Sequence, residues 1–251
     1  MTTAPKLPGL SIILPCHDEA PNVRRAVEEA TQAAERVAEA HEILVVDDGS
    51  RDGTRGVAEL CAAEDSRVRV LAHEQNHGYG GALRTGISAA RLAWVFITDA
   101  DLQFDLRELE QFLPFAVDHE LVVGYRITRA DGLHRRANAA AWNALVHVMF
   151  DIPIRDVDCA FKLMRRDVVQ DFTLVCDGAT ISTELIAKAQ ARGARIAELG
   201  VHHRPRVAGK ASGANPRVVL GAFGQLRLVR AELRAEQATG GLTPAPRPRP
   251  A

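Results

Sequence analysis

Four short apolar runs in the first half of the chain constrain its fold more than any other feature. The runs are rich in β-branched residues, and segments of helical composition separate them. Strands and helices that alternate in this way predict an α/β fold, with a mostly parallel central sheet and helices on both faces. We expect strands at residues 10–14, 42–46, 68–71 and 94–98, and helices at residues 21–40, 54–63 and 82–90.

Proline and glycine mark further boundaries. We expect Pro15 to end the first strand, Pro21 to open the first helix, and a glycine-rich turn at residues 76–81 to precede the third helix. The second half is less regular. Its pattern predicts strands at residues 121–124 and 195–199, a loop entering a strand within residues 156–164, and helices at residues 133–150, 183–191 and 217–235.

The composition of the 251-residue chain excludes several classes of protein. Hydrophobic residues make up 47% and charged residues 25%, as in ordinary globular domains. The formal net charge of −1 gives no attraction to nucleic acid. We expect no secretory signal at residues 1–10 and no membrane span, because no run reaches about 18 apolar residues. Four dispersed cysteines form no CxxC pair, which favours a cytoplasmic location without zinc or disulfides: Cys16, Cys61, Cys159 and Cys176.

Acidic residues directly follow two of the expected strands. Ligands of parallel sheets bind beyond the carboxyl ends of the strands, so these carboxylates are expected to line one site. Asp99 and Asp101 offer the hard oxygen ligands that a divalent cation takes, and Gln103 adds a neutral oxygen. Such a cation would bridge the diphosphate of a nucleotide donor. The alternative is that Asp-x-Asp only ends a strand or caps the next helix.

The pair Asp47 and Asp48 also allows two interpretations. With Gly49 and Ser50 behind it, the pair is typical of a turn that caps a helix, yet a carboxylate here can bind a nucleotide base or ribose. Residues 15–19 would form another wall of the pocket, with His17 either stacked on a base or idle. Residues 76–81 lack the GxGxxG and Walker spacings, so they indicate either backbone close to a ligand or a tight turn.

These segments, in this order, resemble family 2 glycosyltransferases, and more narrowly the dolichol-phosphate mannose synthase branch of polyprenyl-phosphate glycosyltransferases. Residues 155–162 resemble the Asp-x-x-x-Gly-Phe-(Arg/Lys) stretch of that branch, and residues 203–206 with 209–210 resemble its basic acceptor-side loop. The resemblance covers residues 10–228. His17 stands where an aromatic residue is usual and Ala160 stands where glycine is usual. We expect no counterpart of the C-terminal membrane helices that many relatives have.

The resemblance implies a GT-A fold and an inverting, Mg²⁺- or Mn²⁺-dependent hexosyltransferase. The sugar would pass from a nucleotide-diphosphate sugar, GDP-mannose or a UDP-sugar, to a polyprenyl phosphate. Nucleotide-side positions are Pro15, His17, Glu19, Asp47, Asp48, Asn76 and Asp99. The metal positions are Asp99, Asp101 and Gln103, and the catalytic positions are Asp101, Asp99 and Arg126. The acceptor-phosphate positions are Arg126, Arg135, Arg206 and Lys210.

An acceptor phosphate, with a second pKa of about 6, needs positioning more than deprotonation. We therefore name no general base; Asp156 and Asp158 either orient the acceptor or sugar, or only support their loop. The expected organisation is an N-terminal extension at residues 1–9, one domain at residues 10–236 and a disordered Pro/Arg tail at residues 237–251. Residues 10–105 would bind the nucleotide sugar, and residues 106–236 the acceptor.

Several alternatives stay open. The acceptor could be a soluble small molecule or a carrier, and the chain could be a catalytically silent nucleotide-sugar-binding protein. A nucleotidyltransferase is less consistent with residues 15–19, which lack a glycine-rich basic loop. Residues 217–230 predict an amphipathic helix that either packs on the protein's own sheet or a second subunit, or lies on a membrane surface. A homodimer, a membrane partner and peripheral contact at the inner membrane face are expectations of the same kind.

Overall fold

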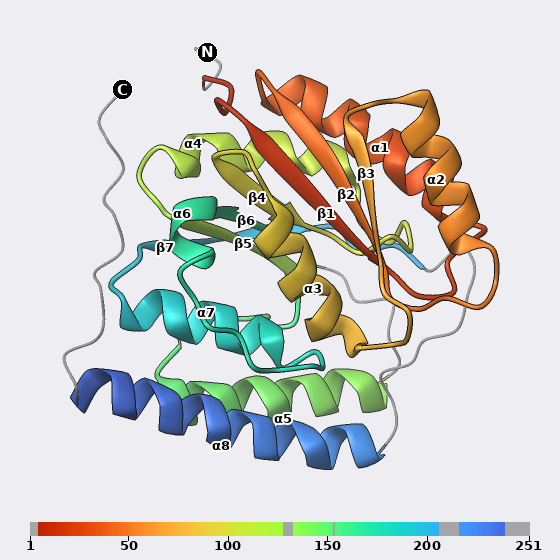
Figure 1. Ribbon diagram of the computed structural model, residues 1–251. Coiled ribbons are helices and arrows are strands. Elements are labelled where there is room, and N and C mark those ends of the chain that lie inside the picture. The colour runs from red at the N-terminus through yellow and green to blue at the C-terminus, as the bar shows by residue number, and fades with distance from the viewer. Residues whose placement is uncertain (1–4, 128–132, 153, 206–215, 239–251) are drawn as a thin grey trace.

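The computed structural model describes residues 5–127, 133–152, 154–205 and 216–238, while the side chains of residues 133–140, 216–220 and 237 lie outside this description. Seven strands form one sheet in the order β3-β2-β1-β4-β6-β5-β7 (Figure 1). Strand β6 is antiparallel to both of its neighbours, and every other pair is parallel. The strands are β1 (Leu10–Cys16), β2 (His41–Asp47), β3 (Val68–Ala72), β4 (Trp94–Ile97), β5 (Leu121–Arg126), β6 (Lys162–Arg165) and β7 (Ile196–Val201).

Helices cover both faces of the sheet (Figure 1). One face carries α1 (Val23–Val37), α2 (Thr54–Glu64), the 3-10 helix η1 (Leu106–Phe112) and α4 (Leu113–Ala116). The other carries α3 (Gly78–Ala89), α5 (Leu133–Phe150), α6 (Arg166–Val169), α7 (Ile181–Ala191) and α8 (Pro216–Ala238). Helices α5 and α8 lie side by side as the outermost layer of this second face, with the rings of Trp142 and Phe223 6.2 Å apart.

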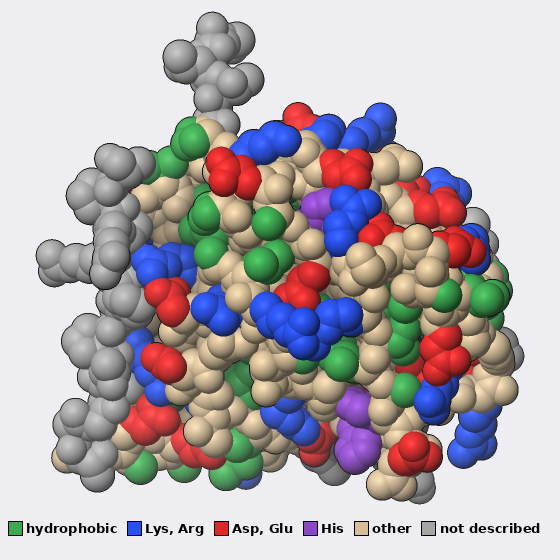
Figure 2. Space-filling model, turned by 45° about the horizontal axis from the view of Figure 1, so that its top comes forward, with side chains coloured by type: hydrophobic (Ala, Val, Ile, Leu, Met, Phe, Trp, Pro, Cys, Tyr) green, Lys and Arg blue, Asp and Glu red, His purple; other side chains and the backbone are tan. Residues whose placement is uncertain are grey.

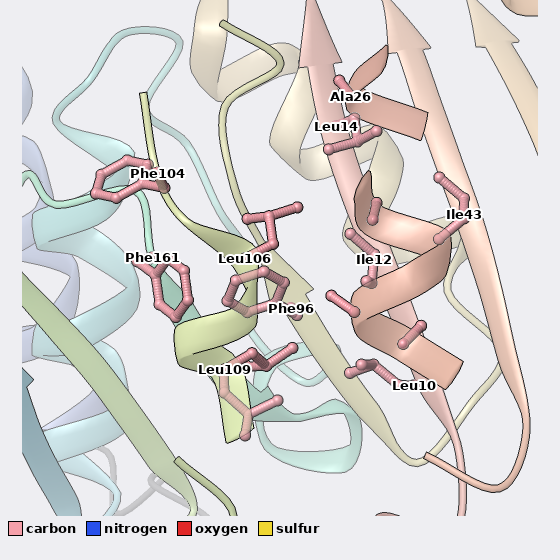
Figure 3. Packing of buried hydrophobic residues seen from close by; sticks show 14 of the residues in the cluster. Leu10, Ile12, Leu14, Ala26, Ile43, Phe96, Phe104, Leu106, Leu109 and Phe161 are labelled. Atoms are coloured by element: carbon pink, nitrogen blue, oxygen red, sulfur yellow. The ribbon is translucent and has the colours of Figure 1, made fainter. Parts of the chain in front are cut away.

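The alternation of side chains along β1 explains why its sequence is apolar throughout. Leu10, Ile12 and Leu14 pack into the core beneath α1, together with Phe96 of β4 (Figure 3). Ile13 points to the opposite face and joins the core that contains Leu83 of α3. A strand buried on both faces needs a continuous apolar run, as parallel sheets generally do.

The predicted strands and helices are confirmed, with three instructive differences in the first half. Strand β1 continues through Pro15 to Cys16 instead of ending at Pro15. Strand β4 pairs with β1 only as far as Ile13, so Pro15 lies where β2 alone pairs with the strand. A missing backbone N–H is tolerated at such a position. Helix α1 is shorter than expected, spanning Val23–Val37 in place of residues 21–40.

The third difference concerns the glycine-rich segment. Helix α3 begins at Gly78, inside the stretch that was expected to be a turn. The glycines of its first turn lie against a neighbouring backbone: a Cβ atom on Gly80 would be 2.1 Å from the carbonyl oxygen of Cys176. The composition of this segment therefore reflects close packing between backbones as well as turn formation.

Helix α8 packs on the protein's own body. Leu226, Val229 and Leu233 are buried against the core, and Glu232 forms an ion pair with the buried Lys188 of α7 at 2.9 Å. Phe223 and Leu228 remain exposed on the same helix. Across the described ranges, no helix is long and apolar enough to cross a membrane.

Candidate active site

Carboxylates gather at the carboxyl ends of β1, β2 and β4. The pairing register places Cys16, the last residue of β1, opposite Asp47, the last residue of β2. Burial raises the pKa of the Cys16 thiol, and the negative charges of Glu19, Asp47 and Asp99 raise it further. Segments far apart in the sequence thus form a single acidic site at this edge of the sheet.

Asp48 is largely engaged in holding the site together. One carboxylate oxygen, Oδ1, accepts hydrogen bonds from the backbone N–H of His77 at 2.8 Å and bonds Nδ1 of His73 at 2.7 Å. Its backbone carbonyl lies 2.9 Å from Nδ1 of His17 and 3.3 Å from the amide nitrogen of Asn76. Asp48 therefore links the end of β2 to the residues that lead into α3.

Asp47 differs from its neighbour. It is 2% exposed, and its Oδ1 atom is buried without a hydrogen-bond partner among the described residues. A buried carboxylate oxygen is costly to leave unpaired, so such an atom at a sheet edge is typical of a ligand contact. Asp47 thus offers an acceptor for a donor group of a bound ligand.

The loop after β1 is held by its own hydrogen bonds. The carboxylate of Glu19 accepts from the Asn22 amide at 2.6 Å, and the Glu19 backbone N–H donates to Thr54 Oγ1 at 2.8 Å. Glu19 therefore supports the start of α1 and its contact with α2. The His17 side chain is half exposed, at 45%, and Pro15 is half-buried, so both border the site.

Asp99 and Asp101 follow β4. Asp101 is 4% exposed, and its Oδ1 atom accepts the backbone N–H of Gln103 at 3.1 Å. Burial and the nearby negative charge of Asp99 raise the pKa of the Tyr79 hydroxyl, in the first turn of α3. The side-chain amide of Gln103 donates to the carbonyl oxygen of Arg204 at 2.8 Å, which ties this loop to the segment after β7.

The donor set fits a divalent cation that shares its ligands with a substrate. Carboxylate oxygens are the hard ligands that Mg²⁺ and Mn²⁺ prefer. In the part of the chain that the structure describes, no cluster of three or more His, Cys, Asp or Glu residues could hold an ion by itself. Two carboxylates plus substrate phosphate oxygens are a common Mg²⁺ arrangement, so Asp99 and Asp101 are compatible with an ion bound together with a diphosphate.

A second charged group lies on the β5–β6 side. Arg126, the last residue of β5, bonds both carboxylate oxygens of Asp156. Burial alone would lower the pKa of Arg126, but the hydrogen bonds and charge of Asp156 raise it. Lys162, the first residue of β6, is 1% exposed; burial lowers its pKa against the opposing charges of Asp158, Asp156 and Asp99.

The structure thus brings most of the sequence-predicted positions to one edge of the sheet. Arg206 and Lys210 fall outside the described residues, and Arg135 lies in α5 without a described side chain. Sequence reasoning missed Tyr79, because nothing local links it to Asp99. Lys162 was noted only as part of a motif, and its burial among carboxylates could not be read from that motif.

Charge on the molecular surface is mixed. On the face shown in Figure 2, basic and acidic side chains of the described residues intermingle without forming one extended basic surface. This agrees with the formal net charge of −1. The carboxylates just described are therefore a local feature of the strand ends.

Comparison with known families identifies the class of protein. Residues 11–173 match the model of glycosyl transferase family 2, and the chain belongs to this family. The strand order and the single antiparallel strand between parallel ones are those of the GT-A fold, which the solved structures below share.

Two curated relatives are similar over most of the chain. Glycosyltransferase AglD of Haloferax volcanii is 31% identical over 212 residues, which cover 78% of this chain and 33% of the relative. The undecaprenyl-phosphate 4-deoxy-4-formamido-L-arabinose transferase of Pseudomonas fluorescens is 29% identical over 212 residues, covering 84% of this chain and 61% of the relative. The chain therefore spans less than two thirds of the length of either.

Two solved structures share the fold at low sequence identity. Glucosyl-3-phosphoglycerate synthase from Mycobacterium tuberculosis, in complex with UDP, has a TM-score of 0.66 and 18% identity, covering 89% of this chain and 80% of that one. Mannosyl-3-phosphoglycerate synthase from Rubrobacter xylanophilus has a TM-score of 0.66 and 22% identity, covering 96% of this chain and 77% of that one.

Proposed function

We propose that this glycosyltransferase carries out a metal-dependent, inverting transfer of a sugar from a nucleoside-diphosphate sugar to a polyprenyl phosphate. The observation that carries the proposal is the acidic edge formed by Asp47, Asp99 and Asp101 in a family 2 chain. The names of the curated relatives support the lipid acceptor, since the second is an undecaprenyl-phosphate transferase. A cytoplasmic enzyme that works at the inner face of a membrane is consistent with this acceptor.

The donor nucleotide would be held at the ends of β1 and β2. The unpartnered Oδ1 atom of Asp47 would accept a hydrogen bond from the base or ribose. His17 and Pro15 would border the nucleotide, while Glu19, Asp48 and Asn76 keep the surrounding loops in place. The donor would be either a GDP-sugar or a UDP-sugar. A binding assay can rank the affinities of the two kinds of donor.

The diphosphate would lie against Asp99 and Asp101. A bound Mg²⁺ or Mn²⁺ would neutralise the negative charge that develops on the leaving diphosphate. The Mn²⁺ and UDP-glucose in a complex of the mycobacterial synthase support this type of cofactor. Gln103, which is bonded to Arg204 through its amide nitrogen, would either present its oxygen to the ion or fix the loop that carries Asp101.

The acceptor phosphate would be positioned by basic residues of the second half of the domain. Asp156 fixes the orientation of Arg126. We assign Arg126, Arg135, Arg206 and Lys210 to binding of the acceptor phosphate. An oxygen of the acceptor phosphate forms a bond to the anomeric carbon as the bond between that carbon and the diphosphate oxygen breaks. Attack from the opposite side inverts the anomeric configuration, and no general base is needed because the phosphate is already ionised.

The test is a transfer assay that varies the donor and the acceptor independently. The purified protein is incubated with radiolabelled GDP- and UDP-sugars, with Mg²⁺ or Mn²⁺, and with undecaprenyl phosphate in detergent or phosphoglyceric acid in buffer. Metal-dependent label in the lipid fraction is the expected result. Label only in the soluble acceptor would replace the lipid acceptor with a soluble one. Nucleotide-sugar binding without transfer to any acceptor would instead favour a silent binding protein.

A further inference from the structure

His73 connects three elements at the acidic edge of the sheet. It directly follows β3, and its backbone N–H donates to the carbonyl oxygen of Asp47 at 2.9 Å. Its side chain is 15% exposed and lies between two polar groups. Nδ1 is 2.7 Å from Oδ1 of Asp48, and Nε2 is 2.9 Å from the hydroxyl of Thr85 in α3. One residue therefore contacts both aspartates at the end of β2 and the helix beside them.

The chemistry of the two partners fixes how the imidazole of His73 is bonded. An ionised carboxylate only accepts hydrogen bonds, so Nδ1 carries a proton and donates to Asp48. In the neutral ring Nε2 accepts from the Thr85 hydroxyl, and in the charged ring it donates to the same oxygen. A hydroxyl group suits either form, because it can both donate and accept. The imidazole thus stays bonded to the Asp48 carboxylate in both charge states.

Asp48 extends this attachment to the segments around the candidate nucleotide site. Its Oδ1 atom also accepts from the backbone N–H of His77 at 2.8 Å, and its backbone carbonyl lies 2.9 Å from Nδ1 of His17. The rings of His73 and His77 are in edge-to-face contact, with their centroids 4.8 Å apart. The end of β2 is therefore joined to the segment after β3 and to the loop after β1.

Asp47 is the direct neighbour of this anchored carboxylate. Its backbone carbonyl accepts from His73, while its side chain keeps a buried Oδ1 atom without a hydrogen-bond partner among the described residues. An acceptor that is already held in place binds a ligand without the ordering cost that a loose side chain would add. The two bonds from His73 are suited to hold Asp47 and Asp48 in such an arrangement.

From these contacts we infer that His73 is a positioning residue for nucleoside diphosphate binding, and that it acts through Asp47 and Asp48 without touching the ligand. This inference rests on the proposed donor site at the ends of β1 and β2. Loss of the imidazole leaves the backbone bond to Asp47 in place but removes one of the two donors to Oδ1 of Asp48. The end of β2 is then less ordered before the ligand arrives, and the cost of ordering it lowers the affinity.

The experiment measures the affinity for GDP and for UDP by isothermal titration calorimetry, well below the unfolding midpoint of every variant. His73→Leu should weaken binding of the nucleotide that the wild type binds by about tenfold or more, since a hydrogen bond to a charged group is lost. His41→Leu is the matched control. It makes the same change at the first residue of β2, the end of the strand opposite to Asp47, and should bind like the wild type.

His73→Asn tests which contact of the imidazole matters. The amide nitrogen of asparagine is attached to Cγ, as Nδ1 of histidine is, so it can donate to Asp48 but cannot reach Thr85. Affinity should therefore return to within about threefold of wild type. A merely structural role predicts another pattern, in which both variants unfold more easily and bind the nucleotide normally while folded. Equally weak binding by His73→Asn and His73→Leu would show that the bond to Asp48 is not the cause.

Asp47→Ala separates the inference from the function on which it rests. If Asp47→Ala weakens binding and His73→Leu stays within about twofold of wild type, the donor site stands and the role of His73 is wrong. If both variants bind like the wild type, the donor assignment at the strand ends falls together with the inference. In turnover assays His73→Leu should raise the donor KM and change the turnover number little, because the effect is on uniform binding. A lower turnover number with unchanged affinity would overturn the inference.

Discussion

The guanidinium of Arg126 bonds both carboxylate oxygens of Asp156, with Nε 2.7 Å from Oδ2 and Nη2 2.8 Å from Oδ1. The Arg126 backbone N–H also donates to Oδ2, at 3.2 Å. Three contacts between the end of β5 and the loop before β6 thus fix the guanidinium of Arg126 in a half-buried position. A lysine cannot reproduce this fork, because its ammonium group has no planar pair of donors.

This pair gives a prediction about stability. Asp156→Ala should lower the free energy of unfolding by about 3 kcal/mol, because it leaves the half-buried guanidinium of Arg126 without its carboxylate partner. Urea denaturation is the measurement. The matched control is Asp167→Ala, which removes the partner of Arg165 at a position that is 43% exposed and should cost about 1 kcal/mol or less. Equal losses in the two variants would show that the Arg126 pair behaves as a surface ion pair.

Asp101→Asn tests metal dependence. The substitution keeps the shape of the side chain but removes its charge, so transfer should fall by about 100-fold or more while the fold is retained. Turnover is measured across a Mn²⁺ titration, with circular dichroism to check the fold. Full activity in the variant, or in wild-type protein treated with EDTA, would refute the metal assignment.

Asp47→Ala tests the donor site. Loss of one hydrogen bond to a charged group, about 1.5–3 kcal/mol, should weaken calorimetric binding of the free nucleoside diphosphate by about tenfold or more. The turnover number should change little, because a contact on the base side contributes mainly uniform binding. Unchanged affinity would leave Asp47 with a purely structural role.

Gly80→Ala tests the close approach of α3 to the backbone of Cys176 and Asp177. The new Cβ atom would lie 2.1 Å from the Cys176 carbonyl oxygen, so the backbone must shift and stability should fall by about 2–3 kcal/mol. Gly56→Ala in α2 is the matched control, since nothing lies within 4 Å of its added Cβ atom. That variant should be slightly more stable, by about 0.4–1 kcal/mol. Similar urea midpoints for the two variants would contradict the packing.

Asp105 gives a prediction about acid stability. A hydrogen bond from Arg107, together with the charge of Arg204, lowers its pKa from 3.8 to about 2. Because the folded-state pKa is the lower one, this stabilisation is present above about pH 4 and is lost as the pH falls through about 2. The unfolding free energy of wild-type protein should therefore fall between these pH values, and in Asp105→Asn that fall should be smaller by about 2 kcal/mol. An unchanged slope would contradict the shift.

Local patterns were enough to predict the sheet and the carboxylates at its edge. Asp47 and Asp99 each follow a continuous apolar run, and parallel strands bring such ends together whatever the details of packing. The family resemblance supplied the glycosyltransferase class. The boundaries of α3 could not be predicted, because they depend on the backbone of Cys176, which lies about a hundred residues away in the sequence.

The roles of individual site residues were also beyond a local pattern. Asp48 and Asp47 are adjacent in sequence, yet one is engaged by His73 and His77 while the other keeps a buried oxygen without a partner among the described residues. The charge of Asp99 acts on Tyr79 from a separate element, and such proximity leaves no periodic signal. Side-chain direction after a strand end is set by tertiary packing, and a single sequence does not encode it locally.

The backbone bridge between Phe104 and His203 has a thermodynamic consequence. The Arg204 backbone N–H donates to the Gln103 backbone carbonyl at 2.7 Å. The side-chain amide of Gln103 donates in turn to the Arg204 backbone carbonyl. One antiparallel bridge therefore joins the loop after Asp101 to the segment after β7, so a ligand that orders one of them would also order the other. Reciprocity then requires that a donor which tightens acceptor binding through this bridge is itself held more tightly, by the same factor, once the acceptor is in place.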